Sequence, residues 1–186
     1  MGQERAGQMD QKRTGRRVVQ KGHIIDYCVD DILSCDGRLL HYDFISHNGA
    51  AAVIPVTDDG QIIMVRQWRD AIDRFTLEIP AGGLESKDEP AIECAKREMA
   101  EETGYRSEKI EFLKTIQTAP AYTNERIDVF VAFDLKKGET HPDPDEHISV
   151  EKHPVKELVE MIFDDRITDG KTVSSILAYY VKYCLV

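Results

Sequence analysis

The stretch that decides the fold runs from residue 83 to residue 105 and reads GLESKDEPAIECAKREMAEETGY. Glu98, Glu101 and Glu102 lie close together in it, and a helix with about 3.6 residues per turn places all three on one face. Carboxylates that share a face repel one another unless water or a cation lies against them, and hard cations such as Mg²⁺ take oxygen ligands of this kind. The stretch therefore predicts either an acidic, solvated helix or a helix that holds a divalent cation.

Both ends of this helix are marked in the sequence. Residues 88–89 are acidic, Pro90 suits the first turn, and Gly104 is a typical C-terminal stop. At about 100° per residue, the apolar side of the helix consists of Ala91, Ile92, Ala95 and Met99. Glu98 and Glu102 project at the edge of that side. A solvated stripe belongs opposite the apolar side, so this position favours a cleft beside the core.

The full spacing resembles the box that defines the Nudix hydrolases. It reads, in order, Gly83, five residues, Glu89, seven residues, Arg97, Glu98, Met99, one residue, Glu101, Glu102, one residue, Gly104 and Tyr105. The family ends its box with an aliphatic residue, where Tyr105 is a bulky apolar variant. The resemblance implies a loop-helix-loop that holds Mg²⁺ or Mn²⁺ against a diphosphate.

The resemblance also implies roles for individual residues. Glu98 and Glu102 are expected to be the principal metal ligands. Glu101 is expected to be an outer or second ligand, and Arg97 to orient the carboxylates.

One departure from the family pattern affects the backbone ligand. Relatives have an Ala-Gly pair whose Gly opens the box and whose Ala carbonyl binds metal, whereas residues 81–83 read Ala-Gly-Gly. The carbonyl ligand is therefore Ala81 or Gly82, and Ala81 is preferred.

Basic residues just upstream of the box are suited to bind a pyrophosphate, because Arg presents a fork of donors to phosphate oxygens. By resemblance, Arg66 is the best match to the family's pyrophosphate-binding arginine, and Glu78 to a glutamate that contacts substrate. Arg69 is a further candidate for substrate binding.

Residues 18–48 read as two strands joined by a turn at residues 35–37. In relatives that resemble ADP-ribose pyrophosphatases, such an N-terminal hairpin packs across a homodimer and helps to bind the nucleoside. Tyr42 and Phe44 are candidates to stack on a base, and ordinary cross-strand packing is the alternative for each. Residues 1–17 are polar, without apolar periodicity, and are expected to form a disordered tail.

Two candidates lie after the box. Pro120 stands where a proline marks the ADP-ribose and related pyrophosphatases, although the usual Ser-Pro-Gly is here Ala-Pro-Ala. Glu146 lies in an acidic loop that resembles the segment from which relatives deliver a carboxylate to the metal-bound water. Asp145 is the second choice, and a plain acidic loop is the alternative.

Composition limits the classes of protein. The net charge is −10, from 24 basic and 34 acidic side chains, which argues against a nucleic-acid partner held by a basic face. The chain has no apolar run long enough to span a membrane. Its four cysteines are widely spaced, as expected of reduced thiols in a cytoplasmic protein.

The resemblance implies the fold class of Nudix proteins, an α/β/α sandwich with a mixed central sheet, preceded by the antiparallel β hairpin. Residues 49–186 are expected to form the hydrolase domain. The expected activity is the metal-dependent cleavage of the pyrophosphate bond in a nucleoside diphosphate sugar, with ADP-ribose the first choice. A GDP-mannose or other sugar-nucleotide hydrolase is the second choice, and a ligand sensor without catalysis is the alternative from another class.

Overall fold

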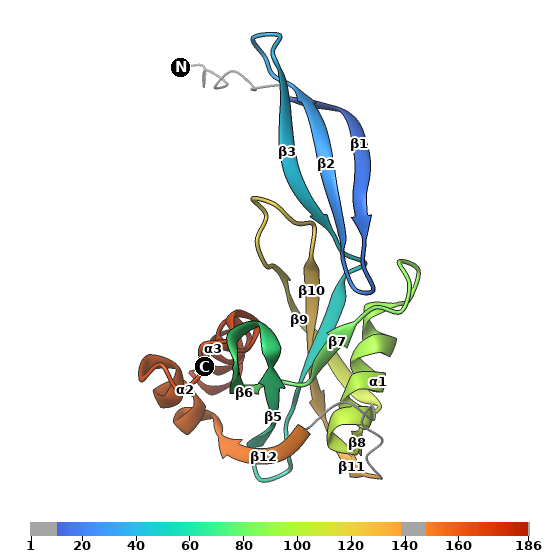
Figure 1. Cartoon of the computed structure of the whole chain (residues 1–186). Helices are drawn as coiled ribbons and strands as arrows, with labels where there is room; N and C mark the ends of the chain where they lie inside the picture. The colour runs from blue at the N-terminus through green and yellow to red at the C-terminus, as the bar shows by residue number, and fades with distance from the viewer. Residues whose placement is uncertain (1–10, 139–147, 186) are drawn as a thin grey trace, which may run out of the picture. The chain divides into compact units, whose positions relative to one another are not determined.

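The computed structural model describes residues 11–138 and 148–185, shown in Figure 1. The chain divides into two compact units. Unit 1 consists of Met1–His47 and Ala119–Glu125, and unit 2 of Asn48–Thr118 and Arg126–Val186. Each is described by itself below.

Unit 1 is built on an antiparallel sheet of three strands, β1 (Lys12–Lys21), β2 (Asp26–Leu33) and β3 (Leu39–Ser46), in that order. The predicted hairpin is the pair β2–β3, and its turn closes with Ser34 N–H donating to Arg38 O at 2.8 Å. Gly37 lies in the left-handed region, with φ of 84°, which favours glycine.

The prediction of a disordered tail up to residue 17 is wrong for residues 12–17, which belong to β1. The apolar period is missing because β1 buries almost nothing, and the strand is held by its pairing with β2. Arg16 lies opposite Asp30, and its Nε and Nη2 donate to the carboxylate at 2.5 and 2.7 Å. Residues 1–10 lie outside the described part of the chain.

Unit 2 contains a mixed sheet and a smaller antiparallel sheet. The first has the order β7 (Ala81–Gly83), β4 (Ala50–Pro55), β10 (Arg126–Phe133) and β9 (Lys109–Gln117). Strands β4 and β10 run parallel, and the other pairs are antiparallel. The second has the order β12 (Ile148–Pro154), β5 (Gln61–Arg69) and β6 (Arg74–Glu78). The remaining short elements are η1 (Asp70–Ile72), β8 (Tyr105–Arg106) and β11 (Lys136–Lys137).

Strand β4 lies at the centre because it is apolar on both faces. Ala52 and Ile54 belong to the core beneath α2 (Val155–Phe163) and α3 (Gly170–Cys184). Ala51 and Val53 belong to the core beneath α1 (Ala91–Thr103). Successive side chains of a strand point to opposite faces, so one strand supplies both cores.

The result is a sandwich with α1 on one side and α2 and α3 on the other (Figure 1). The predicted α/β/α class with a mixed central sheet is confirmed. Helix α2 begins after Pro154, and Asp169 caps α3 by accepting from Thr172 N–H at 2.9 Å. In the residues that the structure covers, no helix is long and apolar enough to cross a membrane.

Candidate active site

Helix α1 has the ends that its sequence predicts. Pro90 is the N-cap in an extended conformation, and the helix stops where Gly104 enters the left-handed region at φ of 71°. The Gly104 N–H donates to Ala100 O at 3.0 Å, which satisfies one of the last carbonyls. The box carboxylates therefore sit on a helix whose length and register are set locally.

The last two turns of α1 lie against β7. Glu102 is buried, with 4% of its surface exposed, and its Oε2 accepts a hydrogen bond from Ala81 N–H at 3.2 Å. Glu98 lies one turn earlier, and its carboxylate occupies the space where a side chain on Gly82 would begin. A β-carbon at residue 82 would overlap that carboxylate, so the glycine is what lets Glu98 approach the backbone.

Arg97 lies among several carboxylates of the box. Its Nη1 donates to Glu98 Oε1 at 2.6 Å and to Glu101 Oε2 at 3.1 Å. Its Nη2 donates to Gly83 O at 3.1 Å. Burial works to lower the pKa of Arg97, but the negative charge of Glu98 and the hydrogen bond that Arg97 donates to it outweigh burial and raise the pKa. Arg97 thus stays cationic and contacts the carboxylates that it is expected to orient, and that role stays a prediction.

The loop between β7 and α1 adds two more acids. Glu85 N–H donates to Glu89 Oε2 at 2.6 Å, which closes the loop. Arg97 Nε lies 3.5 Å from Glu89 Oε1 and 3.8 Å from Glu85 Oε1. Glu85 was not among the candidates from sequence, because it has no fixed place in the motif spacing.

These groups fit a hard divalent cation. Glu98 and Glu102 present carboxylate oxygens beside the backbone of residues 81–83, and the glycine at 82 leaves room for that approach. Within residues 11–138 and 148–185, no three acidic, His or Cys side chains converge closely enough to hold a metal by themselves. A cation at this site would therefore complete its coordination with backbone, water or substrate oxygens.

A second charged cluster lies along the antiparallel pair β5–β6, between the last residue of β5, Arg69, and the last residue of β6, Glu78. Glu78 is 2% exposed, and its two carboxylate oxygens accept from Arg69 Nε and Nη2 at 2.8 and 2.6 Å. Lys171 Nζ and Thr76 Oγ1 also donate to Glu78. Burial works to raise the pKa of Glu78, but hydrogen bonds from Arg69 and the charge of Lys171 lower it to about 2.

Arg69 stays cationic in this cluster. The hydrogen bond that it donates to Glu78 raises its pKa against desolvation, and the charges of Glu78, Asp169 and Glu102 add to this effect. The pairing of β5 with β6 places Arg69 and Glu78 on one face of the sheet. Lys171 was missed from sequence because it lies on the last helix, far along the chain from both.

Arg66 lies on the other face of β5. It shares that face with Met64 and with Leu77, which belong to the core beneath α2 and α3. Its Nε and Nη2 donate to Glu151 at 2.5 and 3.2 Å. A role for Arg66 in pyrophosphate binding stays a prediction, and the structure adds Arg69 as the arginine that lies with Glu78.

The three other substrate candidates lie in unit 1. The guanidinium of Arg16 lies over the ring of Phe44, 3.5 Å from the ring centroid. The side chain of Tyr42 is exposed. Pro120 lies in the turn that is bonded to β3 through Ile45 N–H and Tyr122 O at 2.7 Å. Their role in nucleoside binding stays a prediction.

Glu146 and its alternative, Asp145, lie outside the described residues.

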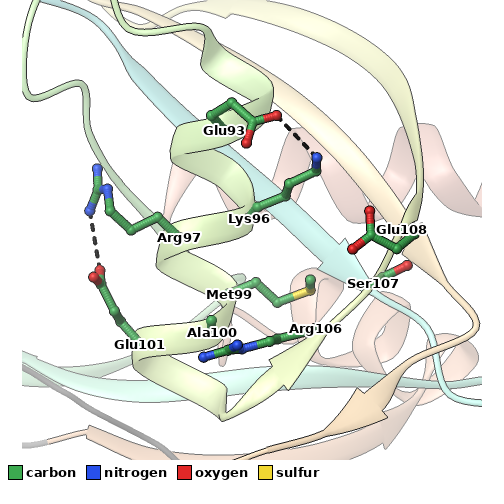
Figure 2. Close-up of a pocket in the computed structure, with 9 residues that line it drawn as sticks. All are labelled: Glu93, Lys96, Arg97, Met99, Ala100, Glu101, Arg106, Ser107 and Glu108. Carbon is green, nitrogen blue, oxygen red and sulfur yellow. Dashed lines mark hydrogen bonds and ion pairs between the residues drawn. The ribbon is translucent and has the colours of Figure 1, made fainter.

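A hollow of about 450 Å³ is lined by side chains of α1 and of residues 106–108 (Figure 2). Figure 2 shows Arg97 and Glu101 paired on one flank of the helix, and Glu93 paired with Lys96 on another. Its lining includes neither Glu98 nor Glu102, the carboxylates that face β7. The hollow is therefore not the expected metal site, although it is large.

The fold and the site together define an α/β sandwich protein. Its acidic helix α1 lies against the glycine-rich strand β7 and is suited to hold a divalent cation. Residues 46–175 match the family model described as NUDIX domain, and the chain belongs to the Nudix family.

Relatives match over nearly the whole chain. An ADP-ribose pyrophosphatase of Bacillus subtilis (strain 168) is 33% identical over 94% of this chain and 92% of its own. A methanol dehydrogenase activator of Bacillus methanolicus is 34% identical over 90% of this chain and 91% of its own. A crystal structure of an ADP compounds hydrolase superposes with a TM-score of 0.84, over 98% of this chain and 100% of that one, at 21% identity. The last comparison supports the fold alone.

Proposed function

We propose that the protein hydrolyses the pyrophosphate bond of a nucleoside diphosphate sugar, with ADP-ribose as the preferred substrate. The products are a nucleoside monophosphate and a sugar phosphate. The observation that carries the proposal is the approach of Glu98 and Glu102 to the glycine-rich strand β7. The relative named ADP-ribose pyrophosphatase supports the choice of substrate.

The cofactor in this proposal is Mg²⁺ or Mn²⁺, held by Glu98, Glu102 and the carbonyl of Ala81 or Gly82. When bound, such a cation neutralises phosphate charge and lowers the pKa of a coordinated water. Glu101 and Arg97 then keep the carboxylates oriented, because Arg97 binds Glu98 and Glu101 through one nitrogen. Arg69 contributes positive charge towards the diphosphate.

The test is a panel of substrates assayed with and without Mg²⁺. ADP-ribose, GDP-mannose and other sugar nucleotides are supplied at equal concentration, and the monophosphate released is measured. Release from ADP-ribose at the highest kcat/KM supports the proposal. A preference for GDP-mannose would select the alternative hydrolase. Tight binding of ADP-ribose with no turnover would instead indicate a ligand sensor.

Glu146 is proposed to take the proton of the attacking water. Glu146→Gln is expected to lower kcat while KM stays within about threefold, the pattern of an interaction made in the transition state. Full kcat in Glu146→Gln, with a loss in Asp145→Asn or Glu101→Gln, would assign the proton acceptor elsewhere.

We also propose that the protein is a homodimer formed through the sheet of unit 1. This sheet exposes large apolar side chains, among them Val18, Val19, Leu39 and Tyr42, each at least 48% exposed. Exposed apolar surface and open strand edges favour association with a second sheet. Light scattering at micromolar concentration is expected to give about twice the chain mass of 21.1 kDa, and a mass near 21.1 kDa contradicts the dimer.

The proposed location is the cytoplasm. All four cysteines are free thiols in the structure, which supports a reducing compartment.

A further inference from the structure

A cavity of about 440 Å³ lies at the start of α3, beside the cluster around Glu78. Its charged side chains are Arg69, Arg74, Glu78, Asp169 and Lys171. Three cations and two carboxylates leave this lining with a net positive charge, in a chain whose net charge is −10. The cavity is therefore one place in unit 2 where an anionic group meets an attractive field.

Lys171 is the cation on which this balance depends. Its side chain is 11% exposed, and its Nζ contacts Glu78 and lies 3.0 Å from Asp169 Oδ2. Burying an ammonium is costly unless it is paired, and here Glu78 supplies the partner. Lys171 thus shares the single negative charge of Glu78 with Arg69.

This sharing changes what Arg69 presents to the cavity. Arg69 and Glu78 alone form a neutral pair, in which the carboxylate cancels the guanidinium at any distance beyond a few ångströms. Asp169 adds a second carboxylate 3.0 Å from Lys171, so the four side chains are neutral with Lys171 and net negative without it. The side chain of Arg69 is 38% exposed, and with Lys171 in place it reaches the cavity without an excess of negative charge beside it.

The first turn of α3 also makes a hydrogen bond with the backbone between β6 and β7, just before the box. Thr172 Oγ1 accepts a hydrogen bond from Ile79 N–H at 3.0 Å, directly after Glu78 in the chain. Two residues further on, Ala81 N–H donates to Glu102. The first turn of α3 therefore contacts the strand just before the residue that binds a box carboxylate.

We propose that Lys171 is a positioning residue for the diphosphate: from α3 it offsets the charges of Glu78 and Asp169, so that Arg69 meets the anionic substrate from a neutral cluster and not from a negative one. This inference rests on the proposed function. Lys171 itself does not take part in bond cleavage, so its removal affects substrate affinity much more than the chemical step.

The test compares the same substitution at two positions of α3. Lys171→Met is expected to raise KM for ADP-ribose about tenfold or more, the scale of a charge-assisted contact, while kcat stays within about threefold. Lys182→Met removes a charge from the exposed last turn of the same helix and is expected to change neither. Lys171→Arg keeps the charge and is expected to keep KM within about threefold of the wild type.

A second variant tests the charge argument with the opposite sign. Asp169→Asn removes a negative charge from the cavity, and Asn is as good an N-cap as Asp, so α3 keeps its start. KM is expected to fall about two- to threefold, the effect of one partly solvated charge. A purely structural role for this turn predicts no decrease.

Equal KM values for Lys171→Met, Lys182→Met and the wild type would overturn the proposal, as would a rise in KM for Asp169→Asn. If Lys171→Met does not fold, Lys171→Arg and Asp169→Asn decide the question. If the wild type cleaves no nucleotide sugar, the proposed function fails. Calorimetry with inorganic pyrophosphate and Mg²⁺ then tests the role of Lys171 separately. Weaker binding of pyrophosphate by Lys171→Met than by Lys182→Met supports the proposal, and equal binding by the two variants overturns it.

Discussion

Single residues decide whether the carboxylates of α1 reach the backbone of β7, and Gly82 is the sharpest case. A β-carbon there overlaps the Glu98 carboxylate, whereas Gly83 has nothing within 4 Å of the same position. Gly82→Ala is expected to lower kcat about 100-fold, because a displacement of about 1 Å in a catalytic group costs this much. Gly83→Ala is the matched control and should keep most of its activity. Equal losses in both variants, measured as kcat/KM for ADP-ribose, would contradict this account.

Glu78 makes stability depend on pH in a defined direction. Its pKa in the folded protein is about 2, below its ordinary value of 4.5. A carboxyl with a lowered pKa contributes stability that is fully present above pH 4.5 and is lost as pH falls towards 2. Glu78→Gln is therefore expected to lower the free energy of unfolding by about 3 kcal/mol at pH 7.

The difference between wild type and Glu78→Gln should shrink steadily as pH falls from 4.5 to 2, as measured by urea denaturation at each pH. Glu93→Gln is the control, because its ion pair with Lys96 is exposed and such pairs contribute about 0–1 kcal/mol. A difference for Glu78→Gln that stays constant across this range would show that the lost stability does not come from the carboxylate charge.

Among the elements, β1 depends on cross-strand side chains more than on burial. Arg16 binds Asp30, lowers the pKa of that carboxyl through its hydrogen bond, and covers the ring of Phe44. Arg16→Ala leaves the buried Asp30 carboxylate with a weaker partner, which costs about 1–3 kcal/mol. Hydrogen exchange of the β1 and β2 amides is expected to speed up accordingly. Arg17→Ala, an exposed neighbour of equal charge, should leave exchange nearly unchanged.

At the scale of the whole molecule, the net charge of −10 repels an anionic diphosphate, and a bound divalent cation would offset this repulsion. Removing metal with EDTA is expected to abolish hydrolysis, and added Mg²⁺ or Mn²⁺ to restore it. The thermal midpoint should hardly change, because the two cores consist of apolar side chains around β4. Hydrolysis that survives exhaustive EDTA treatment contradicts the metal-dependent mechanism.

The sequence by itself determined what depends on neighbours along the chain. The ends of α1 follow from Pro90 and Gly104, and its carboxylates follow from helical spacing, because caps and periodicity act within a few residues. Strand β4 is also a short apolar run in the sequence, the pattern of a strand buried on both faces. For the same reason the strand at residues 12–17 was missed, since its pairing with β2 leaves no pattern in an exposed segment.

Only the tertiary structure decided which distant residues meet. It brings Lys171 on α3 to Glu78 on β6, assigns Arg69 to that cluster, and places Arg66 on the opposite face with Glu151. It also shows that Gly82 makes room for Glu98. The spacing of residues in the sequence does not predict these contacts, because each depends on how strands and helices far apart in the chain pack together.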